Sequence, residues 1–130
     1  MMLATDWPGF ASGLSPDVVK SGVPISGLYD LEPIRLTYLN EDVRLTEDVA
    51  HRNSPLRLTP KGPSAMVVAA GGIESGEFHR LQSELVAAWR PHIPDIEEIA
   101  MPGLHHFNVV TALGEADSPL YQAARRRILD

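Results

Sequence analysis

A continuous hydrophobic run lies near the middle of the chain. Residues 65–70 contain no polar side chain and end at two glycines, Gly71 and Gly72, a pattern typical of a parallel strand buried on both faces. After Ser75, hydrophobic side chains recur at intervals of three and four residues until Pro91. This spacing predicts an amphipathic helix directly after the strand.

Shorter hydrophobic segments extend this pattern on both sides. Residues 18–26 are rich in β-branched side chains and predict a first strand, although Pro24 cannot donate a ladder hydrogen bond and favours an edge or irregular strand. Residues 96–101 predict a third strand. Residues 31–53 contain two weak helical stretches, of which the second begins with Thr46 as its N-cap.

The last third of the chain predicts two more helices. One is expected over about residues 106–113, and Ser118 followed by Pro119 predicts the start of another over residues 120–129. The alternation of strand and helix indicates an α/β fold with about three parallel strands and flanking helices. Three strands are fewer than the about five or six of a usual sheet. We therefore expect residues 1–130 to form one partial α/β domain.

Composition and charge argue against several classes of function. The net charge of −6 gives no basic surface for nucleic acid, and no run of about 18 apolar residues could span a membrane. The absence of cysteine excludes disulfides and thiolate chemistry, and the five histidines show no metal-ligand spacing. We expect no metal and no cofactor. The first residues lack the pattern of a signal peptide, so we expect a soluble cytoplasmic protein.

Two residues that could act together follow predicted strands. Glu74 lies between the second strand and its helix, and His106 follows the third strand. Chemistry in α/β folds is placed on loops at the carboxyl ends of parallel strands. A carboxylate there could hydrogen-bond the imidazole, fix its tautomer and support its charge when it accepts a proton. We therefore expect the Glu74 carboxylate to lie about 2.6 to 3.2 Å from a ring nitrogen of His106.

A purely structural role fits the same two positions. Glu74 could complement the positive end of the helix that follows it, and His106 could be a polar residue with satisfied hydrogen bonds. The residues alone leave both interpretations open.

Four motifs, in this order along the chain, resemble the arylformamidase (kynurenine formamidase) branch of the α/β-hydrolases. They are Ser26-Gly27-Leu28-Tyr29-Asp30-Leu31-Glu32-Pro33, Asn53-Ser54-Pro55, Gly71-Gly72-Ile73-Glu74-Ser75-Gly76-Glu77-Phe78-His79-Arg80 and His105-His106-Phe107. The resemblance implies that Glu74 is the acid of a catalytic triad and that His106 is its general base. Asp30 and Glu77 also match recurrent family positions, and we interpret them as residues that position the site. The chain departs from the family pattern at Leu81 and His105.

The nucleophile of such a triad is missing from this sequence. An α/β-hydrolase carries its serine on a Gly-x-Ser-x-Gly elbow ahead of the acid and the histidine, and no such motif occurs here. The family's sequence just after the elbow resembles residues 1–7, so we expect the chain to begin a few residues beyond the nucleophile. The resemblance thus implies the C-terminal part of a serine hydrolase that acts on a formamide or small carboxylic ester.

An alternative is a catalytically inactive fragment that acts only by binding or self-association. Without the strands that should flank residues 18–25, the sheet would expose an unpaired edge. We therefore expect a homo-oligomer.

Overall fold

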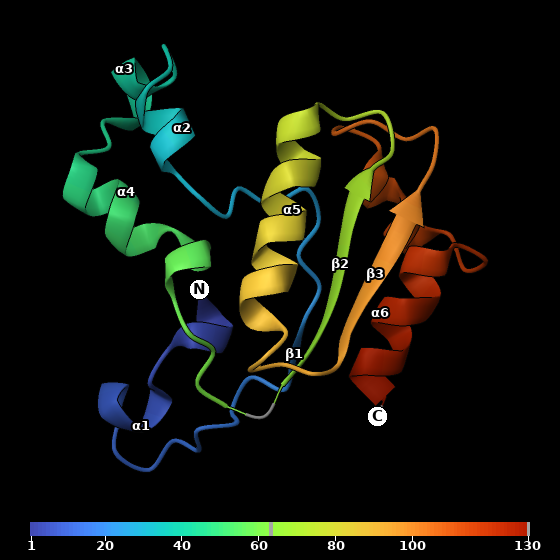
Figure 1. Ribbon diagram of the computed structural model, residues 1–130. Coiled ribbons are helices and arrows are strands. Elements are labelled where there is room, and N and C mark those ends of the chain that lie inside the picture. Colours follow the sequence, from blue (N-terminus) through green and yellow to red (C-terminus); the bar gives the residue numbers. More distant parts are fainter. Residues whose placement is uncertain (63, 130) are drawn as a thin grey trace.

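The centre of the structure is one parallel sheet with the strand order β1-β2-β3 (Figure 1). The structure is a computed structural model that describes residues 1–62 and 64–129. Its strands are β1 (Ser21–Gly22), β2 (Ala65–Gly71) and β3 (Ile96–Met101). The register of β2 and β3 pairs Met66 with Ile96 at one end and Gly71 with Met101 at the other. The α/β class with three parallel strands is therefore confirmed.

Strand β2 is buried on both faces, as its continuous hydrophobic run predicted. Met66 and Val68 pack toward helix α5 (Gly76–Trp89), while Val67 and Ala69 pack toward helix α6 (Pro119–Leu129). All four side chains are at most 1% exposed. Figure 1 shows α5 and α6 on opposite sides of the sheet. Because β2 and β3 are parallel, their carboxyl ends lie side by side at one end of the sheet.

The two long helices begin where the sequence predicted. Helix α5 starts after Ser75, and helix α6 starts at Pro119. The Ser118 hydroxyl accepts a hydrogen bond from the backbone N–H of Tyr121, so it satisfies a donor in the first turn of α6.

The first strand is shorter than the sequence predicted. Only Ser21–Gly22 form β1, because Pro24 has no N–H with which to continue the ladder. The chain rejoins the sheet beyond Pro24, where Ile25 bridges Ala69 and the N–H of Ser26 donates to the carbonyl of Ala69 at 2.8 Å. The carboxyl end of this first segment therefore still lies beside the end of β2.

The helix expected over residues 106–113 is wrong in its start and its type. A 3-10 helix, η3, spans Val109–Gly114 instead. Side-chain hydrogen bonds hold the preceding residues in a turn: Asn108 Oδ1 accepts from the N–H of His105 at 2.6 Å, and His105 Nδ1 accepts from the N–H of Phe107 at 3.1 Å. Such local bonds compete with helix formation.

Short helices occupy the rest of the chain. The segment expected to hold two helical stretches contains three, and its last helix begins after Thr46 as predicted. Helices α2 to α4 form a group beyond α5 (Figure 1). The short elements are η1 (Met2–Ala4), α1 (Trp7–Phe10), α2 (Glu32–Arg35), α3 (Asn40–Val43), α4 (Glu47–Asn53) and η2 (Pro55–Arg57).

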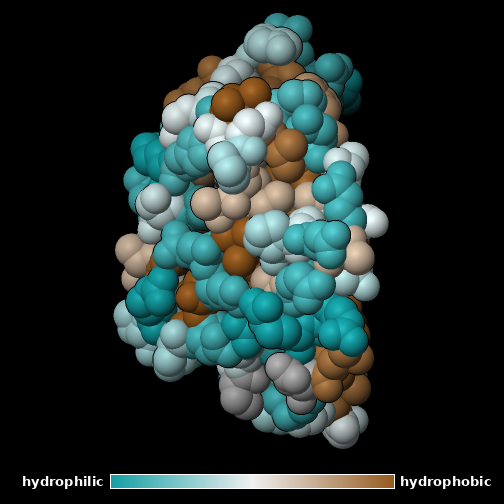
Figure 2. Space-filling view, turned by 90° about the vertical axis from the view of Figure 1, so that its right-hand side faces the viewer, coloured by the Kyte–Doolittle hydropathy of each residue, from teal (hydrophilic) through white to brown (hydrophobic). Residues whose placement is uncertain are grey.

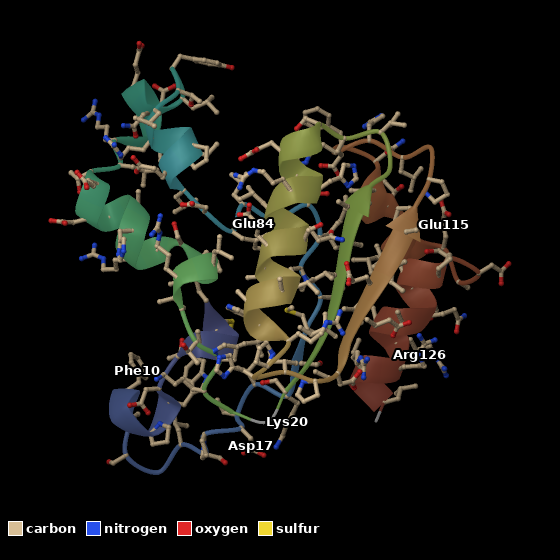
Figure 3. All side chains as sticks on the ribbon, in the orientation of Figure 1. Phe10, Asp17, Lys20, Glu84, Glu115 and Arg126 are labelled. Atoms are coloured by element: carbon tan, nitrogen blue, oxygen red, sulfur yellow. The ribbon has the colours of Figure 1, made fainter. Side chains whose placement is uncertain are left out.

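Charged side chains line the side of the molecule beyond β3. Glu97 pairs with Arg126 of α6 at 2.7 Å, and Glu98 pairs with Arg90 at 3.1 Å. Figure 3 labels Arg126 on this side of the molecule. The space-filling view of this side shows a largely hydrophilic surface with separate hydrophobic areas (Figure 2). Charges on an edge strand disfavour pairing with another chain. Among the helices of the described residues, none is long and apolar enough to cross a bilayer.

Candidate active site

Glu74 lies in the turn that connects β2 to α5. Its backbone N–H donates to the carbonyl of Gly71 at 3.0 Å, and its Oε1 accepts from the N–H of Gly71 at 2.7 Å. The side chain is only 1% exposed. A buried carboxylate is costly unless hydrogen-bond donors surround it, and this turn supplies one from the backbone.

His106 lies in the loop after β3, and the structure brings it to Glu74. Its Nδ1 is 3.1 Å from Glu74 Oε2, within the distance that the strand-end argument predicted. The His106 ring lies against the ring of Phe78, with centroids 4.7 Å apart, and meets the edge of Phe107 at 5.4 Å. Its side chain remains 45% exposed. The imidazole is thus held on one side and open on the other.

The charged form of Glu74 is favoured at this site. Burial alone would raise the pKa of the Glu74 carboxyl, but hydrogen bonds from the Ser26 hydroxyl, the Gly71 N–H and His106 oppose it. The net result is a pKa below the ordinary value, so Glu74 is a carboxylate at neutral pH. The imidazole can donate a hydrogen bond to this carboxylate when its Nδ1 carries a proton. Its Nε2 is then the ring nitrogen that can accept a proton.

Ser26 is a contact of this site that the sequence analysis did not predict. Its hydroxyl hydrogen-bonds Glu74 Oε1 across 48 residues of sequence. Ser26, Glu74 and His106 each follow one of the three neighbouring strand segments. All three therefore lie at the carboxyl end of the sheet. Ser26 is the last residue of the predicted first strand and the first residue of a family motif, and these two positions were the signals that could have found it.

Phe78 is the second such contact. It belongs to the hydrophobic spacing that predicted the helix, and it lies in the first turn of α5, where it reaches the His106 ring.

Gly71 allows the two loops of the site to approach each other. A Cβ at this position would lie 2.4 Å from the carbonyl oxygen of Leu104, in the loop that carries His106. It would also lie 3.0 Å from Glu74 Oε1. Only glycine therefore fits between the end of β2 and the loop after β3.

Asp30 and Glu77, which we interpreted as residues that position the site, make contacts of different kinds. Asp30 Oδ1 accepts from the N–H of Glu32 at 3.1 Å and from the buried Ser54 hydroxyl at 3.3 Å. Glu77 forms an ion pair with Arg80 on the surface of α5. Asp30 thus holds the loop that carries Ser26 against the end of α4.

The remaining titratable residues do not suggest a metal centre. Within residues 1–62 and 64–129, no group of three or more His, Asp or Glu side chains is arranged to hold an ion. The arrangement therefore offers acid–base chemistry through a buried carboxylate and a half-exposed imidazole.

Comparison with known proteins shows what this chain is similar to. No family model matches the chain. It is 34% identical to "Kynurenine formamidase" of Salmo salar over 94% of its length, and 35% identical to "Kynurenine formamidase" of Danio rerio over 87%. The matches cover 42% and 39% of those proteins, so the chain spans less than half the length of these curated relatives.

A solved structure agrees with these relatives. The crystal structure of a proposed thioesterase from Silicibacter sp. TM1040 superposes with a TM-score of 0.77 at 29% identity, covering 93% of this chain and 43% of that one. The chain is therefore a homologue of the kynurenine formamidases and has the fold of a C-terminal portion of an α/β-hydrolase.

Proposed function

We propose that residues 1–130 form one partial domain of a serine hydrolase that acts on a formamide or a small carboxylic ester. The observation that carries the proposal is the 3.1 Å contact between a buried Glu74 and a half-exposed His106 at the ends of neighbouring strands. In the proposed triad, Glu74 is the acid and His106 the general base. The serine nucleophile comes from sequence outside this chain.

The names of the relatives support the proposed substrate class. The two curated relatives are named for a formamidase, and the solved neighbour is described as a proposed thioesterase. Formamides, esters and thioesters are all cleaved by transfer of an acyl group to water. The aromatic rings of Phe78 and Phe107 beside His106 fit an aromatic group near the reacting bond.

Each step of this reaction gives the histidine a defined task. His106 Nε2 takes the proton of the serine hydroxyl as its oxygen attacks the acyl carbon, and then gives that proton to the leaving amine or alcohol. Water then attacks the acyl-serine that has formed, and His106 takes the water proton and returns it to the serine oxygen. This step releases the acid and the free serine. Glu74 stays ionised and supports the imidazolium that forms in each half of the cycle.

The proposal is tested by supplying the missing nucleophile. Alone, the chain should hydrolyse p-nitrophenyl acetate or N-formylkynurenine no faster than its own His106→Ala variant. Fused to an upstream segment with a Gly-x-Ser-x-Gly elbow and an oxyanion loop, it should gain turnover. Turnover by the unfused chain that is lost in Ser26→Ala would contradict the proposal, because the nucleophile would then lie within the chain.

Self-association is a second candidate function. Several hydrophobic side chains are largely exposed, among them Phe10 at 76%, Tyr38 at 80% and Ile128 at 80%. In the described part of the chain, β1 pairs only with β2, whereas charged residues protect the outer edge of β3. We expect sedimentation at micromolar concentration to show a dimer or larger species. A well-folded monomer would rule out this function.

We also propose a cytoplasmic location. The sequence contains no cysteine, so it has no disulfide that would favour an oxidising compartment.

A further inference from the structure

We propose that Ser26 is a positioning residue, whose hydroxyl fixes the Glu74 carboxylate so that its second oxygen faces His106. This inference rests on the proposed role of Glu74 and adds a residue to which the proposed triad gives no role.

The contacts around Glu74 divide its two oxygens between two tasks. Oε1 accepts one hydrogen bond from the Ser26 hydroxyl. It accepts a second from the N–H of Gly71, at 2.7 Å. Oε2 faces His106 Nδ1 at 3.1 Å. Two donors on one oxygen restrict rotation of the carboxylate, so the other oxygen stays directed at the imidazole.

The backbone of Ser26 adopts an unfavourable conformation that serves this contact. Its φ of 48° lies in the left-handed region, where residues with a Cβ are uncommon. Strain of this kind persists only where the surroundings enforce it, and it is concentrated at functional sites. Here it carries the Ser26 side chain from the sheet edge to the buried carboxylate.

The residues after Ser26 are closely packed. The ring of Tyr29 packs so closely on Gly27 that a Cβ there would lie 2.4 Å from Tyr29 Cε1. Tyr29 is only 5% exposed, and its carbonyl accepts from the N–H of Leu56 at 2.9 Å. Burial raises the pKa of the Tyr29 hydroxyl to about 12, and the nearby Glu74 charge also raises it.

The same geometry argues against Ser26 as a nucleophile. Its hydroxyl bonds to the acid and not to the imidazole, so His106 is not placed to remove its proton. Removal of the Ser26 hydroxyl should therefore disturb Glu74 first and act on His106 only through it.

Nuclear magnetic resonance of the intact chain tests the inference without any need for turnover. Titration of the Glu74 carboxyl carbon should show that Ser26→Ala raises its pKa by about one unit, because the charged form loses a donor. The ring nitrogens of His106 should also lose part of their preference for the Nδ1–H tautomer. Ser26→Gly, which accepts the left-handed backbone without strain, should show the same two changes.

Ser21→Ala is the matched control, since the Ser21 hydroxyl bonds the carbonyl of Arg127 and does not contact Glu74. It should leave both signals unchanged. The inference is overturned if Glu74 titrates as in the wild type in both Ser26 variants. It is also overturned if only Ser26→Ala changes it, because backbone strain and not the hydroxyl would then be the cause.

Kinetics of the serine-bearing fusion separate this inference from the proposed function. Ser26→Ala should lower kcat about tenfold with KM nearly unchanged. An unchanged kcat would contradict the positioning role. If His106→Ala left turnover unchanged while the Ser26 variants still shifted the Glu74 titration, the proposed function would fail and the structural contact would stand.

Discussion

Replacing His106 with alanine in the serine-bearing fusion is expected to lower kcat/KM by about 10⁴-fold or more. The imidazole both removes the serine proton and returns it to the leaving group, so no step of acyl transfer proceeds normally without it. Glu74→Ala should cost somewhat less, because the imidazole remains and loses only its orientation and its charge partner. Steady-state hydrolysis of p-nitrophenyl acetate measures both losses.

The neighbouring histidine provides a matched control for this prediction. His105 is exposed, and its Nδ1 accepts from the N–H of Phe107, so it takes no part in the contact with Glu74. His105→Ala should change kcat/KM less than tenfold. Equal losses in the two variants would show that the loop, and not the His106 imidazole, is what the reaction needs.

Gly71→Ala is expected to lower the free energy of unfolding by about 2 kcal/mol and to separate Glu74 from His106. The added methyl group would meet the carbonyl oxygen of Leu104 at 2.4 Å, and backbone at the end of a strand cannot move away without disturbing the sheet. The loop after β3 should be displaced outward. Chemical denaturation measures the first effect, and the His106 ring resonances report the second.

Gly76 supplies the comparison five residues further along the chain. It is the first residue of α5, and a Cβ there would meet no atom within 4 Å. Gly76→Ala should therefore leave stability unchanged or raise it by about 0.5 to 1 kcal/mol, since alanine favours helix. If both variants lost stability equally, close packing of the two loops would not explain the glycine at position 71.

The elements with regular side-chain patterns were predictable from the sequence. The hydrophobic run of β2, the spacing of α5 and the Ser118-Pro119 start of α6 each reflect a local rule with a direct physical cause. The first strand lies at the edge of the sheet as predicted but is shorter, and the helix expected from residue 106 was mispredicted. A missing donor at Pro24 ended β1 early, and side-chain bonds of His105 and Asn108 replaced the first helical turn.

The site was predictable only in part, for a related reason. Glu74 and His106 follow predicted strands, so the topology of a parallel sheet alone predicts that they lie close together. Ser26 also follows a bridge to β2, but its contact depends on a left-handed backbone at Ser26, in a segment where Tyr29 packs closely on Gly27. A tertiary contact of that kind leaves no periodic signal in the sequence.

The position of the three residues after separate strand segments also has a consequence for how the molecule folds. The bonds that define the site join residues 32 and 48 positions apart, so each one closes a long loop and costs chain entropy before it forms. Contacts of such long range form slowly compared with helix α5, which needs only local bonds. The histidine and its acid should therefore meet late in folding, after β2 and β3 have found their register.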